Sequence, residues 1–360
     1  MKALVRLILA LPFCVESHAL DLNAEAEKAL NNLSKQLQKS KVIKVGPRLF
    51  NRKVTPQMAP KPDELWLGFV GDSSATGAAS HPDFRATFAG IFSAATKSLN
   101  PKERLISPIR VMYTTEEYSF GYQIGQLLRL PPDRIVIAAE DGAKINSMHT
   151  QMLRLLAVGS PTLPPVIFVS YMANDICPKE VFKEDIELFR SNYAGEIQKQ
   201  FDAIAQLPPS KLGTKIYILQ PLDLVNVLAN PDLLSQKVPL ESHKDVTCEQ
   251  LRAGTFGNDF SKFMQNSLRG ECPGIFNLTN NPGQHLGQVR TLQDAQAEVL
   301  NNAITNFNLR GLRIKMTLAK SPREIRLSAG DLANDCFHPS QLGAAKIALQ
   351  LMANELVSPK

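Results

Sequence analysis

The run Leu65-Trp-Leu-Gly-Phe-Val70 is continuously apolar and ends directly at Gly71-Asp72-Ser73. A short apolar run of this kind is typical of a strand buried on both faces of a parallel sheet. Open α/β sheets carry their sites beyond the carboxyl ends of their strands, so Ser73 is predicted to lie at such a site. Taken alone, a Gly-Asp-Ser tripeptide is more typical of an ordinary turn.

Similar apolar runs alternate with segments of helical periodicity along the rest of the chain. Strands are predicted at 65–70, 134–138, 166–170, 215–219 and 313–318, and helices at 82–98, 118–129, 145–157, 180–205, 291–308 and 340–357. This alternation predicts a three-layer α/β/α sandwich with a mainly parallel sheet and right-handed crossovers. The chain has 360 residues and 44% apolar content, enough to bury a large core.

A second informative stretch, Asp335-Cys-Phe-His338, lies far downstream of Ser73. A serine, a histidine and an aspartate together can form a catalytic triad. Ser73 would be the nucleophile, His338 the base, and Asp335 the group that orients the imidazole. Asp335 can reach the imidazole if this segment forms a turn, and Pro339 favours a turn because it suits the first position of the following helix.

Four blocks of the sequence, taken in order, resemble those of the GDSL/SGNH hydrolases. They are Gly71-Asp72-Ser73, Ala139-Glu-Asp-Gly142-Ala143, Asn174-Asp175 and Asp335-Cys-Phe-His338. The resemblance covers nearly all of the chain after about residue 60. Cys177, shortly after Asn174, and Cys336, between Asp335 and His338, make the chain more similar to the phospholipase B branch of that superfamily.

The resemblance implies an oxyanion hole as well as a triad. Its donors would be the backbone N–H of Ser73, the backbone N–H of Gly142 and the side-chain amide of Asn174. Glycine suits this role because it lets the backbone approach a substrate closely. The alternatives are that Gly142 is only a turn before a helix and that Asn174-Asp175 is an ordinary turn pair.

Two positions depart from the family pattern. Met172 stands where a glycine often precedes the asparagine, and Ser74 stands where leucine or isoleucine usually follows the nucleophile. Both leave the chemical roles intact and put the shape of the pocket in question. The alignment of the blocks favours Ser73 over Ser74 as nucleophile and a structural role for Asp72. His81 and His149 are interpreted as surface or packing residues.

The N-terminus has the pattern of a secretory signal peptide over 1–19. Lys2 and Arg6 flank the start of a short apolar run, and Ser17-His-Ala19 offers small residues at the spacing of a cleavage site. Cleavage near Ala19 would give a secreted or periplasmic protein. The apolar run is too short to span a bilayer, so no transmembrane segment is expected in the mature chain.

The mature chain is predicted to have three parts. Residues 20–61 form a helix followed by a proline-rich linker, and 62–360 form the hydrolase domain. Within that domain, 228–290 is polar, rich in Gly, Pro and Asn, and interrupts the alternation of strands and helices, so it is interpreted as an insertion near the site.

Removal of Cys14 with the signal leaves Cys177, Cys248, Cys272 and Cys336. An even count in an oxidising compartment favours two disulfides over four buried thiols, and three connectivities are possible. If Asn174 and His338 converge on one substrate carbonyl, as the resemblance implies, Cys177 and Cys336 lie close together. The expected pairs are therefore Cys177–Cys336 and Cys248–Cys272.

The formal net charge is +6, and the segment from Lys35 to Lys61 holds eight basic residues and no acidic one. This tract is interpreted either as a solvated linker or as a contact for an anionic membrane surface. It lacks interleaved aromatic residues and any recognised nucleic-acid-binding module, so no nucleic acid is expected as a partner. The six histidines are scattered, and neither a metal nor a cofactor is expected.

The combined pattern predicts a secreted serine esterase that acts on a lipid ester, as a phospholipase B-like or lysophospholipase-like enzyme. A carbohydrate or polysaccharide acetyl esterase is the alternative enzyme, since substrate choice resides in loops rather than in the fold. The remaining alternative is a non-catalytic periplasmic binding protein on the same scaffold.

Overall fold

The structure is a computed structural model, and it describes residues 65–78, 80, 119–131, 134–157, 160–171, 173–177, 185–239, 245–253 and 282–356. Several expectations lie outside these residues. They are the signal peptide, the helix and linker of 20–61 with the boundary at residue 62, the helix at 82–98, His81, Met172 and Cys272. Within the described ranges, no helix is both long and apolar enough to cross a membrane.

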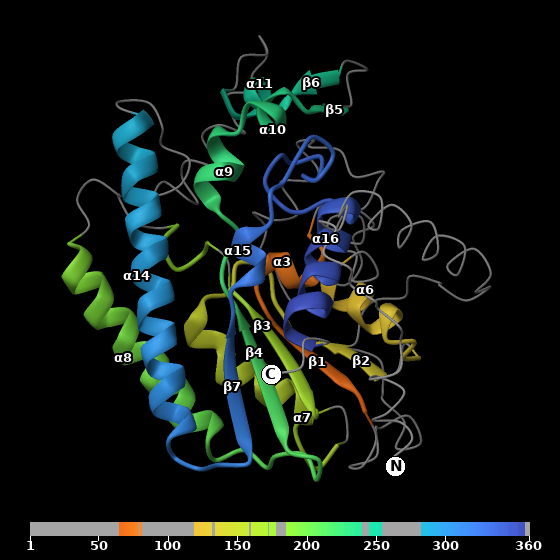
Figure 1. Cartoon of the computed structure of the whole chain (residues 1–360), viewed down its shortest axis with the longest axis vertical. Coiled ribbons are helices and arrows are strands. Elements are labelled where there is room, and N and C mark those ends of the chain that lie inside the picture. The colour runs from red at the N-terminus through yellow and green to blue at the C-terminus, as the bar shows by residue number, and fades with distance from the viewer. Residues whose placement is uncertain are drawn as a thin grey trace, which may run out of the picture.

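A five-stranded parallel sheet forms the centre of the molecule (Figure 1). Its strands are β1 (Leu67–Gly71), β2 (Ile135–Ile137), β3 (Val166–Ser170), β4 (Thr214–Leu219) and β7 (Ile314–Ala319). All five strand predictions are confirmed, and the order across the sheet is β2-β1-β3-β4-β7. The chain changes direction across the sheet between β1 and β3, and such a switch point opens a crevice beyond the strand ends.

Aromatic rings stack across the three central strands. Phe69 on β1 is in register with Phe168 on β3, which is in register with Tyr217 on β4. The ring centroids are 5.3 Å apart in the first pair and 5.4 Å in the second, and both pairs are stacked. Offset stacking adds about 0.5–1.5 kcal/mol per pair to the burial of these rings. This stack fixes the register of the strands that lead to the site.

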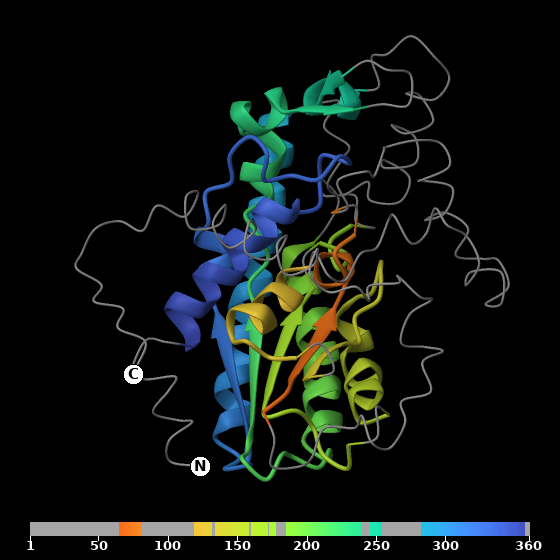
Figure 2. The same cartoon turned by 90° about the vertical axis from the view of Figure 1, so that its right-hand side faces the viewer.

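Helices cover both faces of the sheet and complete the predicted three-layer sandwich (Figure 2). One face carries α6 (Phe120–Leu127) and α16 (Gln341–Leu351), and the other carries α7 (Met148–Leu156) and α8 (Ile186–Ile204). Helix α14 (Pro282–Asn308) packs against α8 and β7. The short helices are α3 (Ser73–Thr76), the 3₁₀ turn η5 (Ile145–Ser147), α15 (Ser321–Glu324) and the π turn η6 (Met352–Leu356).

The expected insertion at 228–290 is only partly an insertion. Its described part begins with α9 (Leu224–Ala229) and continues through α10 (Pro231–Ser235), the antiparallel pair β5 (Lys237–Pro239) and β6 (Asp245–Thr247), and α11 (Cys248–Ala253). These elements follow β4 and lie beyond the carboxyl ends of the strands, at the top of Figure 1. Residues 282–290, however, are the first turns of α14, with His285 and Val289 buried.

The last predicted helix also begins later than its proline suggests. Ser340 is the N-cap of α16, and its side chain accepts hydrogen bonds from the N–H groups of Leu342 and Gly343. Pro339 precedes the helix and forms an isolated bridge with Leu332. The helix start therefore follows the capping serine rather than the proline.

Candidate active site

Ser73 lies at the carboxyl end of β1, as the first residue of α3. The preceding Asp72 is buried and caps this helix, because its Oδ1 accepts from the backbone N–H of Ser74 at 2.9 Å and from Ser74 Oγ at 2.7 Å. Ser74 Oγ also lies 2.9 Å from Ser170 Oγ on β3. Asp72 and Ser74 therefore tie β1 to β3, and Ser73 is the serine whose hydroxyl is left to face the site.

Gly71 allows this close junction of the two strands. Its φ is +152°, and a Cβ at this position would lie 2.1 Å from the carbonyl oxygen of Ser170. A larger residue would push β1 away from β3 at the point where the chain turns toward Ser73. Gln151 on α7 holds Gly71 from the other side, accepting from its N–H at 2.7 Å and donating to its carbonyl at 2.9 Å.

The Asp335–His338 turn is brought to Ser73 from the loop that follows α15. His338 Nε2 is 2.7 Å from Ser73 Oγ, and His338 Nδ1 is 2.5 Å from Asp335 Oδ2. Asp335 Oδ1 accepts from the backbone N–H groups of Phe337 and His338, each at 3.0 Å, so the carboxylate organises the turn as well as the imidazole. The structure thus brings all three predicted side chains into one hydrogen-bonded chain.

The surroundings of Asp335 and His338 favour the charged form of both side chains. Burial acts to raise the pKa of Asp335, but His338 and the N–H donors hold it below its ordinary value. Burial acts to lower the pKa of His338, but the Asp335 carboxylate outweighs it and raises the pKa above 6.5. Asp141 and Asp72 contribute in the same direction. A histidine held in this way is suited to accept a proton from a hydroxyl.

Gly142 lies in a tight turn after β2. The N–H of Ala143 donates to the carbonyl of Glu140 at 3.1 Å, and Gly142 has a φ of +73°. A turn with positive φ at its third position favours glycine there. Among the described residues, no acceptor contacts the N–H of Gly142 or the N–H of Ser73.

Asn174 follows β3, in the turn next to the Gly142 turn. Its Nδ2 donates to the carbonyl of Ala143 at 3.0 Å and, through a longer contact of 3.4 Å, to Asp72 Oδ2. The side chain therefore links the ends of β1, β2 and β3. Because a 3.4 Å hydrogen bond is weak, a ligand oxygen can replace Asp72 with little cost.

Two carboxylates within the family-like blocks, to which the sequence analysis assigned no role, support this arrangement. Asp175 accepts from the N–H of Ile145 with both oxygens at 3.3 Å, and burial raises the pKa of Asp175 to about 7. Thr76 Oγ1 donates to Asp141 Oδ1 at 2.5 Å, which joins α3 to the Gly142 turn. Their positions beside Asn174 and Gly142 were the only signal for them in the sequence.

The predicted disulfide pairing is wrong. Cys336 is bonded to Cys248 on α11, with Cα atoms 5.3 Å apart. Cys336 has a φ of +60°, and its Sγ is bonded to α11 rather than to Cys177. Cys177 also forms a disulfide, and its partner lies outside the described residues. The predicted Cys177–Cys336 and Cys248–Cys272 pairs are thus both excluded.

The loop that carries His338 is anchored by a buried ion pair. Lys346 Nζ on α16 donates to Asp331 Oδ2 at 2.5 Å and to Ser328 Oγ at 3.1 Å, and both charged side chains are buried. Backbone bonds from Ala333 N–H to the His338 carbonyl and from Ser340 N–H to the Asp331 carbonyl close the loop on itself. Removing one partner of such a pair leaves an uncompensated buried charge, which is strongly destabilising.

The other predicted features are not part of this cluster. His149 lies on α7, where its backbone N–H donates to Gln200. Within the described ranges, no group of three or more His, Cys, Asp and Glu side chains is placed to hold a metal ion.

No protein-family model and no curated protein matches this sequence. Among solved structures, the chain is similar to a carbohydrate esterase whose active site displays divergent catalytic and non-catalytic binding functions, with 12% identity and a TM-score of 0.37 over 81% of this chain and 70% of that one. It is also similar to an extracellular lipase from Streptomyces rimosus, with 10% identity and a TM-score of 0.39 over 81% of this chain and 99% of that one. At TM-scores below 0.5, what these proteins act on does not carry over to this chain.

Proposed function

We propose that the protein is a serine hydrolase of carboxylic esters, with Ser73 as nucleophile, His338 as base and Asp335 as the residue that orients the imidazole. The observation that carries this proposal is the continuous chain of hydrogen bonds from Ser73 Oγ through both ring nitrogens of His338 to Asp335. A serine hydroxyl is a weak nucleophile unless a base lies within hydrogen-bond reach, and here the base is 2.7 Å away.

In the proposed reaction, Ser73 Oγ attacks the ester carbonyl carbon while its proton passes to His338 Nε2. The imidazolium that forms is stabilised by Asp335. Collapse of the tetrahedral intermediate breaks the bond to the alcohol oxygen, which takes the proton from His338 and leaves an acylated Ser73. A water molecule then attacks the acyl group with His338 again as base, releasing the acid and restoring Ser73.

The oxyanion of the intermediate would be bound by the N–H groups of Ser73 and Gly142 and by Asn174 Nδ2. Support comes from the two N–H groups that have no acceptor among the described residues and from the long Asn174–Asp72 contact. Donors that are already aimed at the developing charge need no reorganisation during the reaction.

The test is hydrolysis of p-nitrophenyl butyrate by the wild type, Ser73→Ala and Ser74→Ala. Ser74 is a neighbouring serine with structural partners, so its replacement is the matched control. We expect Ser73→Ala to lose activity and Ser74→Ala to keep it at reduced stability. Activity in Ser73→Ala together with its loss in Ser74→Ala would identify the wrong nucleophile. Activity in neither variant nor the wild type would favour a non-catalytic binding protein.

For the substrate class, we propose a lipid ester, on the resemblance of the cysteine-containing blocks to the phospholipase B branch. An acetylated carbohydrate is the competing substrate. Lysophosphatidylcholine and acetylated xylan should be offered to the wild type and to Ser73→Ala, with the released acids measured by mass spectrometry. Release of long-chain acid that depends on Ser73 supports the lipid assignment, and release of acetate alone contradicts it.

We propose further that residues 62–360 act as the hydrolase domain of an exported protein. The Cys248–Cys336 disulfide supports an oxidising compartment, where such bonds persist. Cleavage near Ala19 is checked by N-terminal sequencing of the exported protein. Contact of the basic 35–61 tract with a membrane is checked by co-sedimentation with anionic and neutral vesicles.

A further inference from the structure

Helix α11 holds a single residue of the Asp335–His338 turn at two points. The Sγ of Cys248, the first residue of the helix, is bonded to the Sγ of Cys336. Arg252 Nη2 donates a hydrogen bond to the carbonyl oxygen of the same Cys336. Cys248 and Arg252 are four residues apart and therefore lie on one face of the helix.

Cys336, the residue that Cys248 and Arg252 both contact, has an unfavourable backbone conformation. Cys336 has a φ of +60°, a left-handed conformation that residues other than glycine rarely adopt unless their surroundings impose it. The left-handed conformation directs the following N–H groups of Phe337 and His338 onto Asp335 Oδ1. Holding Cys336 therefore also holds the carboxylate and the imidazole in their relative positions.

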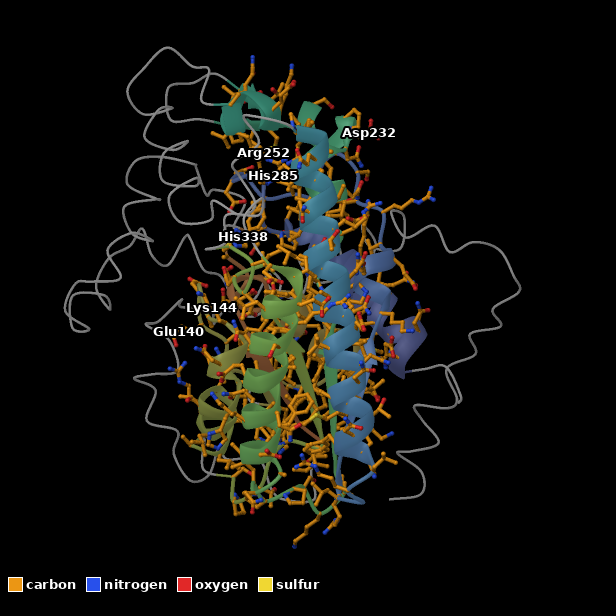
Figure 3. All side chains as sticks on the ribbon, turned by 90° about the vertical axis from the view of Figure 1, so that its left-hand side faces the viewer. Glu140, Lys144, Asp232, Arg252, His285 and His338 are labelled. Atoms are coloured by element: carbon orange, nitrogen blue, oxygen red, sulfur yellow. A yellow bond between two sulfur atoms is a disulfide. The ribbon has the colours of Figure 1, made fainter. Side chains whose placement is uncertain are left out.

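Arg252 is itself anchored to the body of the protein. Its Nη1 donates to the carbonyl of Val227 at 3.0 Å and to that of Leu228 at 3.4 Å, both in the last turn of α9. Helix α9 follows β4 after a short connection. The Arg252 guanidinium therefore links the segment that leaves the sheet at β4 to the Asp335–His338 turn. Figure 3 shows Arg252 on the side of His338 that faces the α9–α11 region.

We propose that Arg252 is a positioning residue, which together with Cys248 sets the Asp335–His338 turn at the distance from which His338 reaches Ser73. This inference rests on the proposed function, because the distance matters only if His338 serves Ser73 as a base. The described part of the predicted insertion thereby becomes a working part of the site rather than an appendage.

The charge of Arg252 gives the proposal a second consequence. The groups that face the Asp335–His338 pair come from several elements: Asp72 after β1, Asp141 after β2 and Arg252 on α11. Burial lowers the pKa of Arg252 to about 10, with the Asp335 carboxylate opposing the shift, so the guanidinium stays charged near neutral pH. As a cation that interacts with Asp335, Arg252 offsets part of the pull of that carboxylate on a proton at His338.

The experiment compares Arg252→Met, Arg252→Lys and Arg313→Met in hydrolysis of p-nitrophenyl butyrate. Arg313 is the matched control, because its Nη2 also donates to two backbone carbonyls, those of Ser210 and Lys211. Arg313 directly precedes β7, so it lies at the opposite end of the sheet from Ser73. Each variant is compared with the wild type in kcat, in KM and in the pH dependence of kcat/KM. Melting temperatures by circular dichroism show that each variant is folded.

We expect Arg252→Met to lower kcat about 10- to 100-fold with little change in KM, since a small misplacement of a catalytic group costs up to about this factor. The acid limb of its pH profile, which is the range where kcat/KM falls as pH drops, should move to higher pH. Arg252→Lys retains the charge but cannot reach both sets of carbonyls, so its kcat should lie between that of the wild type and that of Arg252→Met, with the acid limb unmoved. Arg313→Met should match the wild type in every kinetic measure.

A purely structural arginine would lower the melting temperature without changing kcat or the acid limb. If Arg252→Met behaves in this way while Ser73→Ala is inactive, the inference is wrong and the proposed function stands. If Ser73→Ala is active, the proposed function itself fails. If Arg252→Met does not fold, a wild-type kcat in Arg252→Lys overturns the inference.

Discussion

Ser73, Gly142 and Asn174 each follow a strand of one parallel sheet, whereas Asp335 and His338 lie in a loop that, within the described part of the chain, is held by side-chain contacts and by its own backbone bonds. The first three form the sheet half of the site, at the ends of β1, β2 and β3. Their spacing follows from the register of those strands, in which Gly71 is opposite Ser170. Many main-chain bonds share the task, so this half depends less on any single side chain than on the close contact of the strands at Gly71.

The other half, called here the loop half, depends on a few tethers. They include the Cys248–Cys336 disulfide, the Arg252 hydrogen bond to Cys336, and the buried Lys346–Asp331 pair. The first two are side-chain contacts between elements far apart in sequence, and the third joins the loop to the helix that follows it. Single substitutions that leave the sheet intact should therefore displace the base while the nucleophile and the proposed oxyanion donors stay in position.

Replacing Ser73 with Ala should have the largest effect, since it removes the reacting atom of the sheet half. Loss of a triad member typically costs about 10⁴–10⁶-fold in kcat. The measurement is the rate of p-nitrophenyl butyrate hydrolysis, with circular dichroism to show an unchanged fold. Near wild-type turnover in this variant would remove Ser73 from the chemistry.

Replacing Asn174 with Ala should lower kcat by about 10²–10³-fold and leave KM nearly unchanged, because an oxyanion donor acts mainly in the transition state. Asn146→Ala is the control, since Asn146 is an exposed asparagine just beyond the Gly142 turn. An unchanged kcat in Asn174→Ala would show that Asn174 is only a link between strand ends.

Replacing Cys248 with Ala tests the loop half. The disulfide joins residues separated by 88 positions, and its loss should reduce the free energy of unfolding by about 2–4 kcal/mol. It should also lower kcat, because Cys336 then loses one of its two attachments to α11. Urea unfolding and kcat are measured on the variant and on the wild type with dithiothreitol. A fall in stability with wild-type kcat would separate the disulfide from positioning.

The pH profile measures how the two halves act on each other. The proposed reaction needs neutral His338, and the pKa of His338 is raised, so kcat/KM should fall as pH drops through a value above 6.5. Asp141, in the sheet half, is one cause of that shift. Asp141→Asn should therefore move the acid limb to lower pH, while its amide oxygen can still accept from Thr76. An unmoved limb would show that the halves are electrostatically independent.

Asp175→Asn should have the smallest effect, and on stability rather than on turnover. The pKa of Asp175 is raised to about 7 by burial, whereas the unfolded chain releases this proton near pH 4. The folded state thus binds more protons between these values, and this group's contribution to stability falls as pH rises from about 4 to 7. The variant should lose less stability than the wild type between pH 5 and pH 8 in thermal melts. Equal losses of stability in the variant and the wild type would contradict a raised pKa of Asp175.

The sequence predicted the sheet half better than the loop half, for a physical reason. Buried parallel strands leave continuous apolar runs, and the residues that follow them must lie at one edge of the sheet. The five strands and the position of Ser73 follow from this rule, whereas Gly142 and Asn174 were predicted from the family resemblance. Asp335 and His338 were found from their spacing and from the resemblance, since neither residue directly follows a strand.

The tethers of the loop half could not be predicted in the same way. The expected Cys177–Cys336 bond assumed that residues next to converging side chains also converge. Cys336 has a left-handed backbone conformation, and its side chain is bonded to α11 instead. Helices α10 and α11 have five and six residues, too few for a periodic pattern, and Gly283 and Gly287 weaken the helical signal at the start of α14.

The Cys248–Cys336 bond also determines at what stage after synthesis the loop that carries His338 becomes fixed. Cys336 follows every strand of the described sheet in chain order, so the bond forms only after all of them have been synthesised. It also needs an oxidant that the compartment of synthesis does not supply, if the protein is exported as proposed. A newly made chain would then carry its nucleophile on a finished sheet while its base is still loosely held. Because the disulfide would form only after export, the esterase would reach full activity outside the compartment in which it is made.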